Sequence, residues 1–191
     1  MDGARAEELL RALGEILDAE DEKPLDIVVC GGMALILQGI VARRTMDIDA
    51  LGVVVSDESG LHVSRPGSVE TFEAAVRRIG GLYEEQPDWF NFAATNQLEM
   101  QMPTGLVERA QLRTYGAKLT VRLCSRWDMV HLKMMAALDR GEEQMTDLVR
   151  MRSTEQEARA AANWCIEQGT SPYRLKMLLE EIGHGNIAGT I

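Results

Sequence analysis

Two aspartates, Asp47 and Asp49, are the residues whose type and spacing most directly suggest chemistry. They flank Ile48 at the start of a segment, 47–55, whose β-branched and apolar residues predict a strand. Because side chains two residues apart in a strand point to the same face, the two carboxylates would lie together while Ile48 enters the core. Magnesium prefers one or two carboxylates together with phosphate oxygens. The pair therefore predicts a Mg²⁺ or Mn²⁺ site, the alternative being a polar strand edge without a ligand.

A pair of glycines, Gly31 and Gly32, precedes this site in the chain. The pair follows a β-branched run, 27–30, and comes before an apolar segment, 33–37, that predicts a short helix. Glycine lets the backbone approach a ligand closely, and the first turn of a helix presents free N–H groups to a phosphate. The order predicts a phosphate-binding turn, unless the glycines form only a tight turn. Together, a phosphate-binding turn and a metal dyad suit phosphoryl or nucleotidyl transfer.

A lysine, Lys133, lies within a predicted helix, 125–140, that is apolar nearly all round. A lysine in such surroundings is costly unless it has an anionic partner or extends to solvent. Arg140 follows two helical turns later and shares its face, so a nucleoside triphosphate would satisfy both cations. The alternative is a lysine that reaches solvent and an arginine at the helix end.

A third carboxylate would complete a metal site of this kind. Glu99 is the candidate because it alternates with apolar neighbours in the segment 98–102, which predicts a strand. Asp88 and Glu108 are weaker competitors. An exposed glutamate on a strand edge is the alternative interpretation of Glu99.

The order of these residues along the chain resembles a known signature. Gly-Gly, a short apolar helix, Gly, Arg, Thr and Asp-Ile-Asp are similar to the signature of the DNA polymerase β nucleotidyltransferase superfamily. The sequence most resembles the abortive-infection AbiEii-like branch, which includes toxins of type IV toxin–antitoxin systems. The segment 132–140 with Asp147-Leu148 is similar to that branch's Lys-x-x-Ala-x-x-x-Arg helix and Asp-Leu pair. Departures are Gly32, where many superfamily members carry Ser, and Gln144, near where a further Asp is often found.

This resemblance implies an enzyme that moves NMP from an NTP to an acceptor hydroxyl of tRNA or protein, with Mg²⁺ or Mn²⁺ as cofactor. Asp47 and Asp49 would hold the metal, with Glu99 as a third ligand and one carboxylate as general base. A cognate antitoxin is a further candidate partner. The implied nucleotide-binding residues are Gly31, Gly32, Arg44, Thr45, Lys133 and Arg140, and Asp147 would orient the nucleotide or support Lys133.

Composition narrows the class of protein further. Of 191 residues, 46% are hydrophobic and 26% charged, which is typical of a globular protein. The longest apolar run, 27–42, is shorter than the roughly 18 residues a membrane span needs, and the charged N-terminus has no apolar signal region. We therefore expect a cytoplasmic protein without a membrane partner. The formal net charge of -10 disfavours general DNA binding.

The expected fold is α/β (α+β), with a small mixed sheet flanked by helices and an all-helical C-terminal portion. Residues 1–124 would form the nucleotidyltransferase core, and residues 125–191 would complete the active-site cleft. Two alternatives to the enzyme remain: a non-catalytic nucleotide- or partner-binding protein of the same fold, and a scaffold. The predicted elements are helices at 5–19, 33–37, 69–79, 125–140, 143–152, 154–168 and 172–182, strands at 27–30, 47–55, 98–102 and 119–123, and a polar loop at 56–67.

Overall fold

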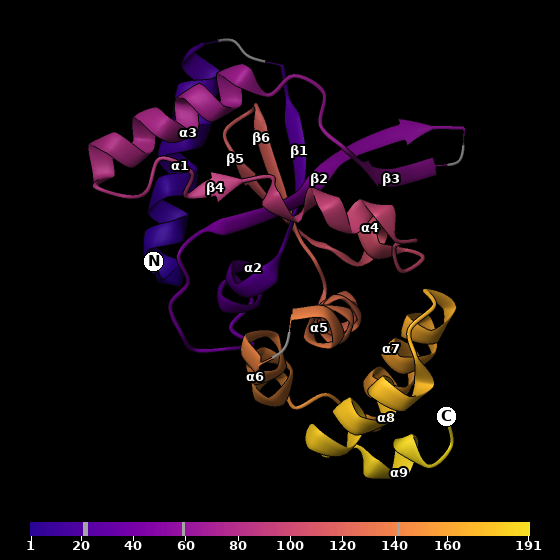
Figure 1. Ribbon diagram of the computed structural model, residues 1–191. Helices are drawn as coiled ribbons and strands as arrows, with labels where there is room; N and C mark the ends of the chain where they lie inside the picture. Colours follow the sequence, from indigo (N-terminus) through magenta and orange to yellow (C-terminus); the bar gives the residue numbers. More distant parts are fainter. Residues whose placement is uncertain (21–22, 59, 141) are drawn as a thin grey trace. The chain divides into compact units, whose positions relative to one another are not determined.

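The computed structural model describes residues 1–20, 23–58, 60–140 and 142–191, with only the backbone described at 140 and 142–144 (Figure 1). The chain divides into two compact units, Met1–Ser125 and Arg126–Ile191. The first contains a mixed sheet flanked by helices, and the second is helical in its described residues. The predicted α/β fold class is confirmed.

The sheet of the first unit has the strand order β3-β2-β1-β6-β5, and β4 pairs with β2 outside this path (Figure 1). The central strand β1 is antiparallel to β2 and parallel to β6. Its last four residues are buried, as expected for a strand with a neighbour on each side and helices over its faces. The strand bounds are β1 Leu25–Cys30, β2 Ile48–Asp57, β3 Gly60–Ser64, β4 Phe90–Asn91, β5 Gln111–Tyr115 and β6 Leu119–Leu123.

Helix α1 (Gly3–Ala19) packs against strand β5. Asp2 caps it by accepting a hydrogen bond from the Arg5 N–H at 3.0 Å, and its apolar stripe is buried. A Cβ on Gly14 would clash with the Tyr115 carbonyl oxygen, so only glycine permits this approach. The other helices of this unit are α2 Gly31–Leu37, α3 Glu70–Tyr83, the 3-10 helix η1 Ala93–Glu99 and α4 Leu106–Arg109.

The structure departs from three predictions of local structure. The alternation at 98–102 does not form a strand: η1 ends at Glu99, and no strand is assigned at 100–102. The polar loop expected at 56–67 contains β3, which pairs with β2 as an edge strand and therefore tolerates polar residues. Helix α3 ends at Tyr83, past the end at residue 79 that the sequence suggested. Gly80 lies inside the helix, and a Cβ there would clash with the Gln86 carbonyl oxygen.

Helices α5 (Arg126–Arg140), α6 (Glu142–Met151), α7 (Glu155–Glu167), α8 (Pro172–Glu181) and α9 (Gly185–Ala188) make up the second unit. The first four confirm the helices predicted there. Thr154 and Glu157 form a reciprocal capping box at the start of α7. The Arg126 guanidinium donates to the Glu157 carboxylate at 2.8 Å, which ties the first turns of α5 and α7 together.

No described helix combines the length and apolar character required to cross a bilayer.

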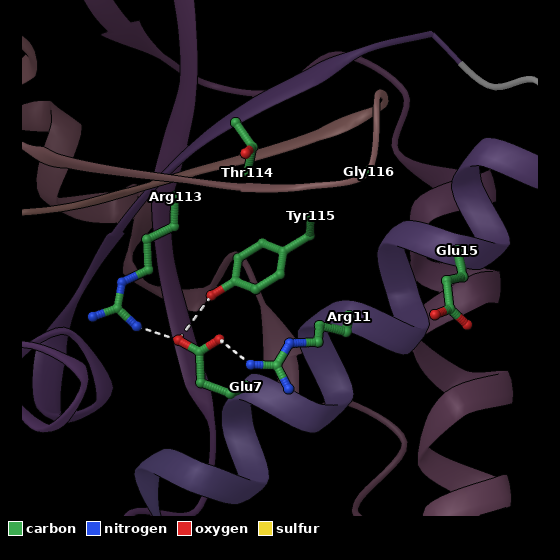
Figure 2. Close-up of a pocket in the computed structure, with 7 residues that line it drawn as sticks. All are labelled: Glu7, Arg11, Glu15, Arg113, Thr114, Tyr115 and Gly116. Atoms are coloured by element: carbon green, nitrogen blue, oxygen red, sulfur yellow. Dashed lines mark hydrogen bonds and ion pairs between the residues drawn. The ribbon is translucent and has the colours of Figure 1, made fainter.

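A surface pocket of about 590 Å³ lies beside the contact between α1 and β5 (Figure 2). Glu7 is at its centre: Arg113 and the Tyr115 hydroxyl donate to its carboxylate, the latter at 3.1 Å, and Arg11 lies 3.6 Å away. Burial, and after it the negative charge of Glu7, raises the pKa of Tyr115 to about 12. The phenol is therefore held neutral in the folded protein.

This pKa predicts a loss of stability at alkaline pH. An unfolded tyrosine ionises near pH 10, whereas folded Tyr115 keeps its proton to about pH 12, so the unfolded state binds fewer protons in between. We expect the free energy of unfolding to fall by about 1 kcal/mol across this window, after a discount for solvent screening. Urea titrations at several pH values should show that Tyr115→Phe removes this component and that Tyr173→Phe, at an exposed tyrosine, leaves it unchanged.

Candidate functional site

The two aspartates lie where three strands meet. Asp49 is the second residue of β2, where it pairs with Cys30 at the end of β1 and with Asn91 in β4. Asp47 directly precedes β2, and both aspartates are half-buried. The dyad thus lies at the end of the central strand from which α2 begins.

Gly31 is required by the position of Asp49. Gly31 is the first residue of α2 and has a φ of 73°, and a Cβ there would lie 2.5 Å from Asp49 Oδ2. The glycine pair therefore forms the first turn of the helix, two residues before the start that the sequence suggested. The carboxylate of Asp49 lies directly over this turn.

We expect Gly31→Ala to impair both stability and the site. The left-handed φ costs a non-glycine residue about 1–2 kcal/mol, and the added methyl group would also displace the Asp49 carboxylate. Gly39→Ala is the matched control, because Gly39 has a φ of 69° with nothing within 4 Å of an added Cβ. Urea unfolding should show both variants destabilised, Gly31→Ala more so. Equal behaviour of the two would contradict the contact.

The arginine that lies against the glycine turn is Arg43. A Cβ on Gly32 would overlap the Arg43 guanidinium, whose Nη1 donates to the Arg44 carbonyl at 3.0 Å. Arg44, the residue that the sequence suggested for nucleotide binding, is exposed. Arg43 is adjacent to Arg44 in the sequence, and their spacing from the glycines does not show which of the two arginines faces them.

Thr45 and Met46 complete the segment between α2 and the dyad. Thr45 exchanges two backbone hydrogen bonds with Met1, at 2.7 and 3.0 Å. These bonds hold the backbone two residues before Asp47. Met46 is 73% exposed, so an apolar side chain stands in solvent directly beside the dyad.

Asn91 is a site residue that sequence reasoning missed. Its Nδ2 donates to Asp47 Oδ2 at 3.3 Å and to the Asp88 carbonyl at 3.1 Å, and its Oδ1 accepts from the Ala93 N–H at 2.8 Å. No local pattern marks Asn91, because the two-residue strand β4 meets β2 through long-range pairing. Asp88, considered as a third carboxylate, contributes its backbone carbonyl to this network.

Glu99 lies at the end of a 3-10 helix and not in the strand that the sequence predicted. At the end of η1 its side chain is 76% exposed and forms an ion pair with Arg65 at 3.1 Å. Within the described parts of the chain, no three His, Cys, Asp or Glu side chains are grouped as a metal site. The structure thus does not bring Glu99 together with Asp47 and Asp49, and its role as third ligand stays a prediction without the strand that suggested it.

The dyad fits a hard divalent cation by its donor chemistry. Asp47 and Asp49 offer carboxylate oxygens, which Mg²⁺ and Mn²⁺ prefer. Their neighbours include the Asn91 amide, the glycine turn and the end of β1. A site with two carboxylates leaves positions for phosphate oxygens and water.

Lys133 and Asp147 form a buried ion pair in the second unit. Lys133 Nζ in α5 lies 2.8 Å from Asp147 Oδ2 in α6, and the side chains are 7% and 5% exposed. Asp147 is therefore the anionic partner that Lys133 requires in its apolar helix. Support of Lys133 is one of the two roles that the sequence suggested for Asp147. Arg140 ends α5, and its side chain, like that of Gln144, lies outside the described residues.

Comparison with known proteins gives a family for this arrangement. Residues 7–154, more than half of the chain, match a family described as "Nucleotidyltransferase of unknown function (DUF6036)". The match includes the glycine turn, the aspartate dyad and the Lys133–Asp147 pair. Searches among curated proteins and among solved structures found no match. The chain belongs to the DUF6036 family of nucleotidyltransferases.

Proposed function

We propose that this protein is a Mg²⁺- or Mn²⁺-dependent enzyme that transfers NMP from an NTP to an acceptor hydroxyl and releases pyrophosphate. The observation that carries the proposal is the placement of the Asp49 carboxylate over Gly31, at the first turn of α2. This contact puts the dyad directly beside backbone N–H groups that suit a phosphate. Membership in a nucleotidyltransferase family supports the general reaction.

The residues divide the reaction between them. Asp47 and Asp49 would hold the cation, with Glu99 retained as the proposed third ligand, and one carboxylate would accept the proton of the acceptor hydroxyl. The acceptor oxygen bonds to the α-phosphorus as the bond to pyrophosphate breaks. Bound Mg²⁺ would supply neutralisation of the phosphate charge.

Nucleotide binding is assigned to backbone groups and cations. Gly31 and Gly32 would seat the phosphates, and Arg43, which lies against Gly32, joins the expected pair Arg44 and Thr45. In the second unit, Lys133 and Arg140 would bind the triphosphate, and Asp147 supports Lys133 through their ion pair.

The acceptor is proposed to be tRNA or a protein side chain. Resemblance to the AbiEii-like branch favours these two classes and a toxin-like role with a cognate antitoxin. The net charge of -10 weakens long-range attraction of RNA and therefore favours protein over tRNA slightly. The second candidate function is non-catalytic nucleotide or partner binding by the same fold, and the half-buried dyad argues against it.

The test is incubation of the purified protein with each labelled NTP, Mg²⁺ or Mn²⁺, and either total tRNA or no added acceptor. The variant Asp47→Asn/Asp49→Asn removes the dyad, and Asp57→Asn/Glu58→Gln changes two acids at the far end of β2 as a matched control. Label in RNA or protein that only the dyad variant loses would support the enzyme and identify the acceptor class. Metal-dependent NTP binding without transfer would point to a missing acceptor. NTP binding that does not depend on the metal would favour the binding protein, and no NTP binding would overturn both.

A further inference from the structure

Asn91 occupies a position beside the dyad that lies outside the sequence signature described above. It pairs with Asp49 across the β2–β4 ladder, and its side chain reaches Asp47, the other member of the dyad. One residue thus contacts both aspartates, Asp49 through the ladder and Asp47 through its amide.

The orientation of the Asn91 amide is determined by its partners. The Ala93 N–H can only donate, so it fixes Oδ1, while the Asp88 carbonyl can only accept, so it fixes Nδ2. With both ends held by the backbone, the amide must present an N–H to Asp47 Oδ2. A bond of this kind holds a carboxylate in one rotamer, as outer partners do for metal-binding side chains.

We infer that Asn91 is a positioning residue that holds Asp47 ready for the cation and, because it is neutral, adds no further negative charge beside the dyad. This inference rests on the proposed function. An aspartate at the same position would add a third negative charge without a change of size. With asparagine, the cation obtains its remaining ligands from the nucleotide phosphates, so the metal alone binds weakly.

The experiment measures Mn²⁺ binding to the full chain without nucleotide, by the electron paramagnetic resonance signal of the free ion. Asn91→Ala removes the hydrogen bond to Asp47 and should raise the Kd about tenfold. Asn91→Asp keeps the acceptor for Ala93 but replaces the amide donor to Asp47 with a carboxylate that can itself bind the cation, and should lower the Kd about tenfold. Asn96→Asp, at an exposed asparagine of η1, adds the same charge as a matched control and should leave the Kd unchanged.

The outcomes separate this inference from the proposed function. If Asn91 only stabilises the turn at Ala93, Asn91→Asp retains that bond and binds Mn²⁺ like the parent chain, which overturns the inference even if Asn91→Ala fails to fold. If Asp49→Asn does not weaken Mn²⁺ binding, the metal lies elsewhere and the proposed site itself fails. Loss of binding in Asp49→Asn together with opposite shifts in the two Asn91 variants supports both.

Discussion

Replacing Asp49 by asparagine is expected to lower the rate of nucleotidyl transfer about 10³-fold or more, because several kcal/mol of charge stabilisation depend on the cation that we propose it holds. Asparagine has the same size, so the contact with Gly31 and the pairing of β2 are retained. The loss should therefore appear in kcat without a change in the urea midpoint. Transfer should be measured with labelled NTP over a range of Mg²⁺ concentrations.

The matched control is Asp57→Asn, at an exposed aspartate that ends the same strand. It changes the net charge equally and should leave the rate within twofold or so of the parent, as expected for a surface site. A rate for Asp49→Asn within tenfold of the parent would show that Asp49 does not hold a catalytic cation. In that case the protein would have the family fold, but its two aspartates would not bind a catalytic cation.

Removing one partner of the Lys133–Asp147 pair should have the largest effect on stability. Asp147→Asn leaves a buried ammonium without its carboxylate and is expected to cost about 3–5 kcal/mol of unfolding free energy. The double variant Lys133→Met/Asp147→Leu removes both charges and should recover most of this loss, because apolar residues of similar volume often replace buried ion pairs well. Urea unfolding followed by circular dichroism measures both effects.

The same double variant tests whether Lys133 also acts in nucleotide binding. A stable double variant that no longer binds NTP would support binding of the triphosphate by Lys133. A stable variant with the NTP affinity of the parent would show that the ion pair has only a structural role. The exposed pair Arg159–Glu155, at 3.1 Å in α7, is the control. Its disruption should cost less than about 1 kcal/mol.

The parts of the site that follow local rules could be predicted from the sequence. Asp47 and Asp49 precede and enter a strand whose apolar pattern is clear, and the glycine pair follows a buried strand. The need of Lys133 for an anion follows from its apolar helix alone. Each of these inferences uses residues within one turn or one strand.

The remaining parts depend on contacts between distant segments. Glu99 lies in an apolar alternation, yet the chain forms a 3-10 helix there instead of a strand. Arg43 and Arg44 are equivalent in the sequence, and only the packing on Gly32 distinguishes them. Asn91 belongs to a strand of two residues, too short to leave a pattern, and its importance arises from its pairing with β2.

The two aspartates differ in how the backbone around them can move. Asp49 lies within a ladder that has partners on both sides, so its amide should exchange with deuterium only on opening of the sheet. Asp47 lies one residue outside the ladder, between Ile48, whose N–H donates to the Trp89 carbonyl, and an exposed Met46. One half of the dyad is therefore held by the backbone ladder of the sheet, while the other takes its position from the Asn91 side chain. The cation that we propose would meet one ligand fixed by strand pairing and one positioned by an amide.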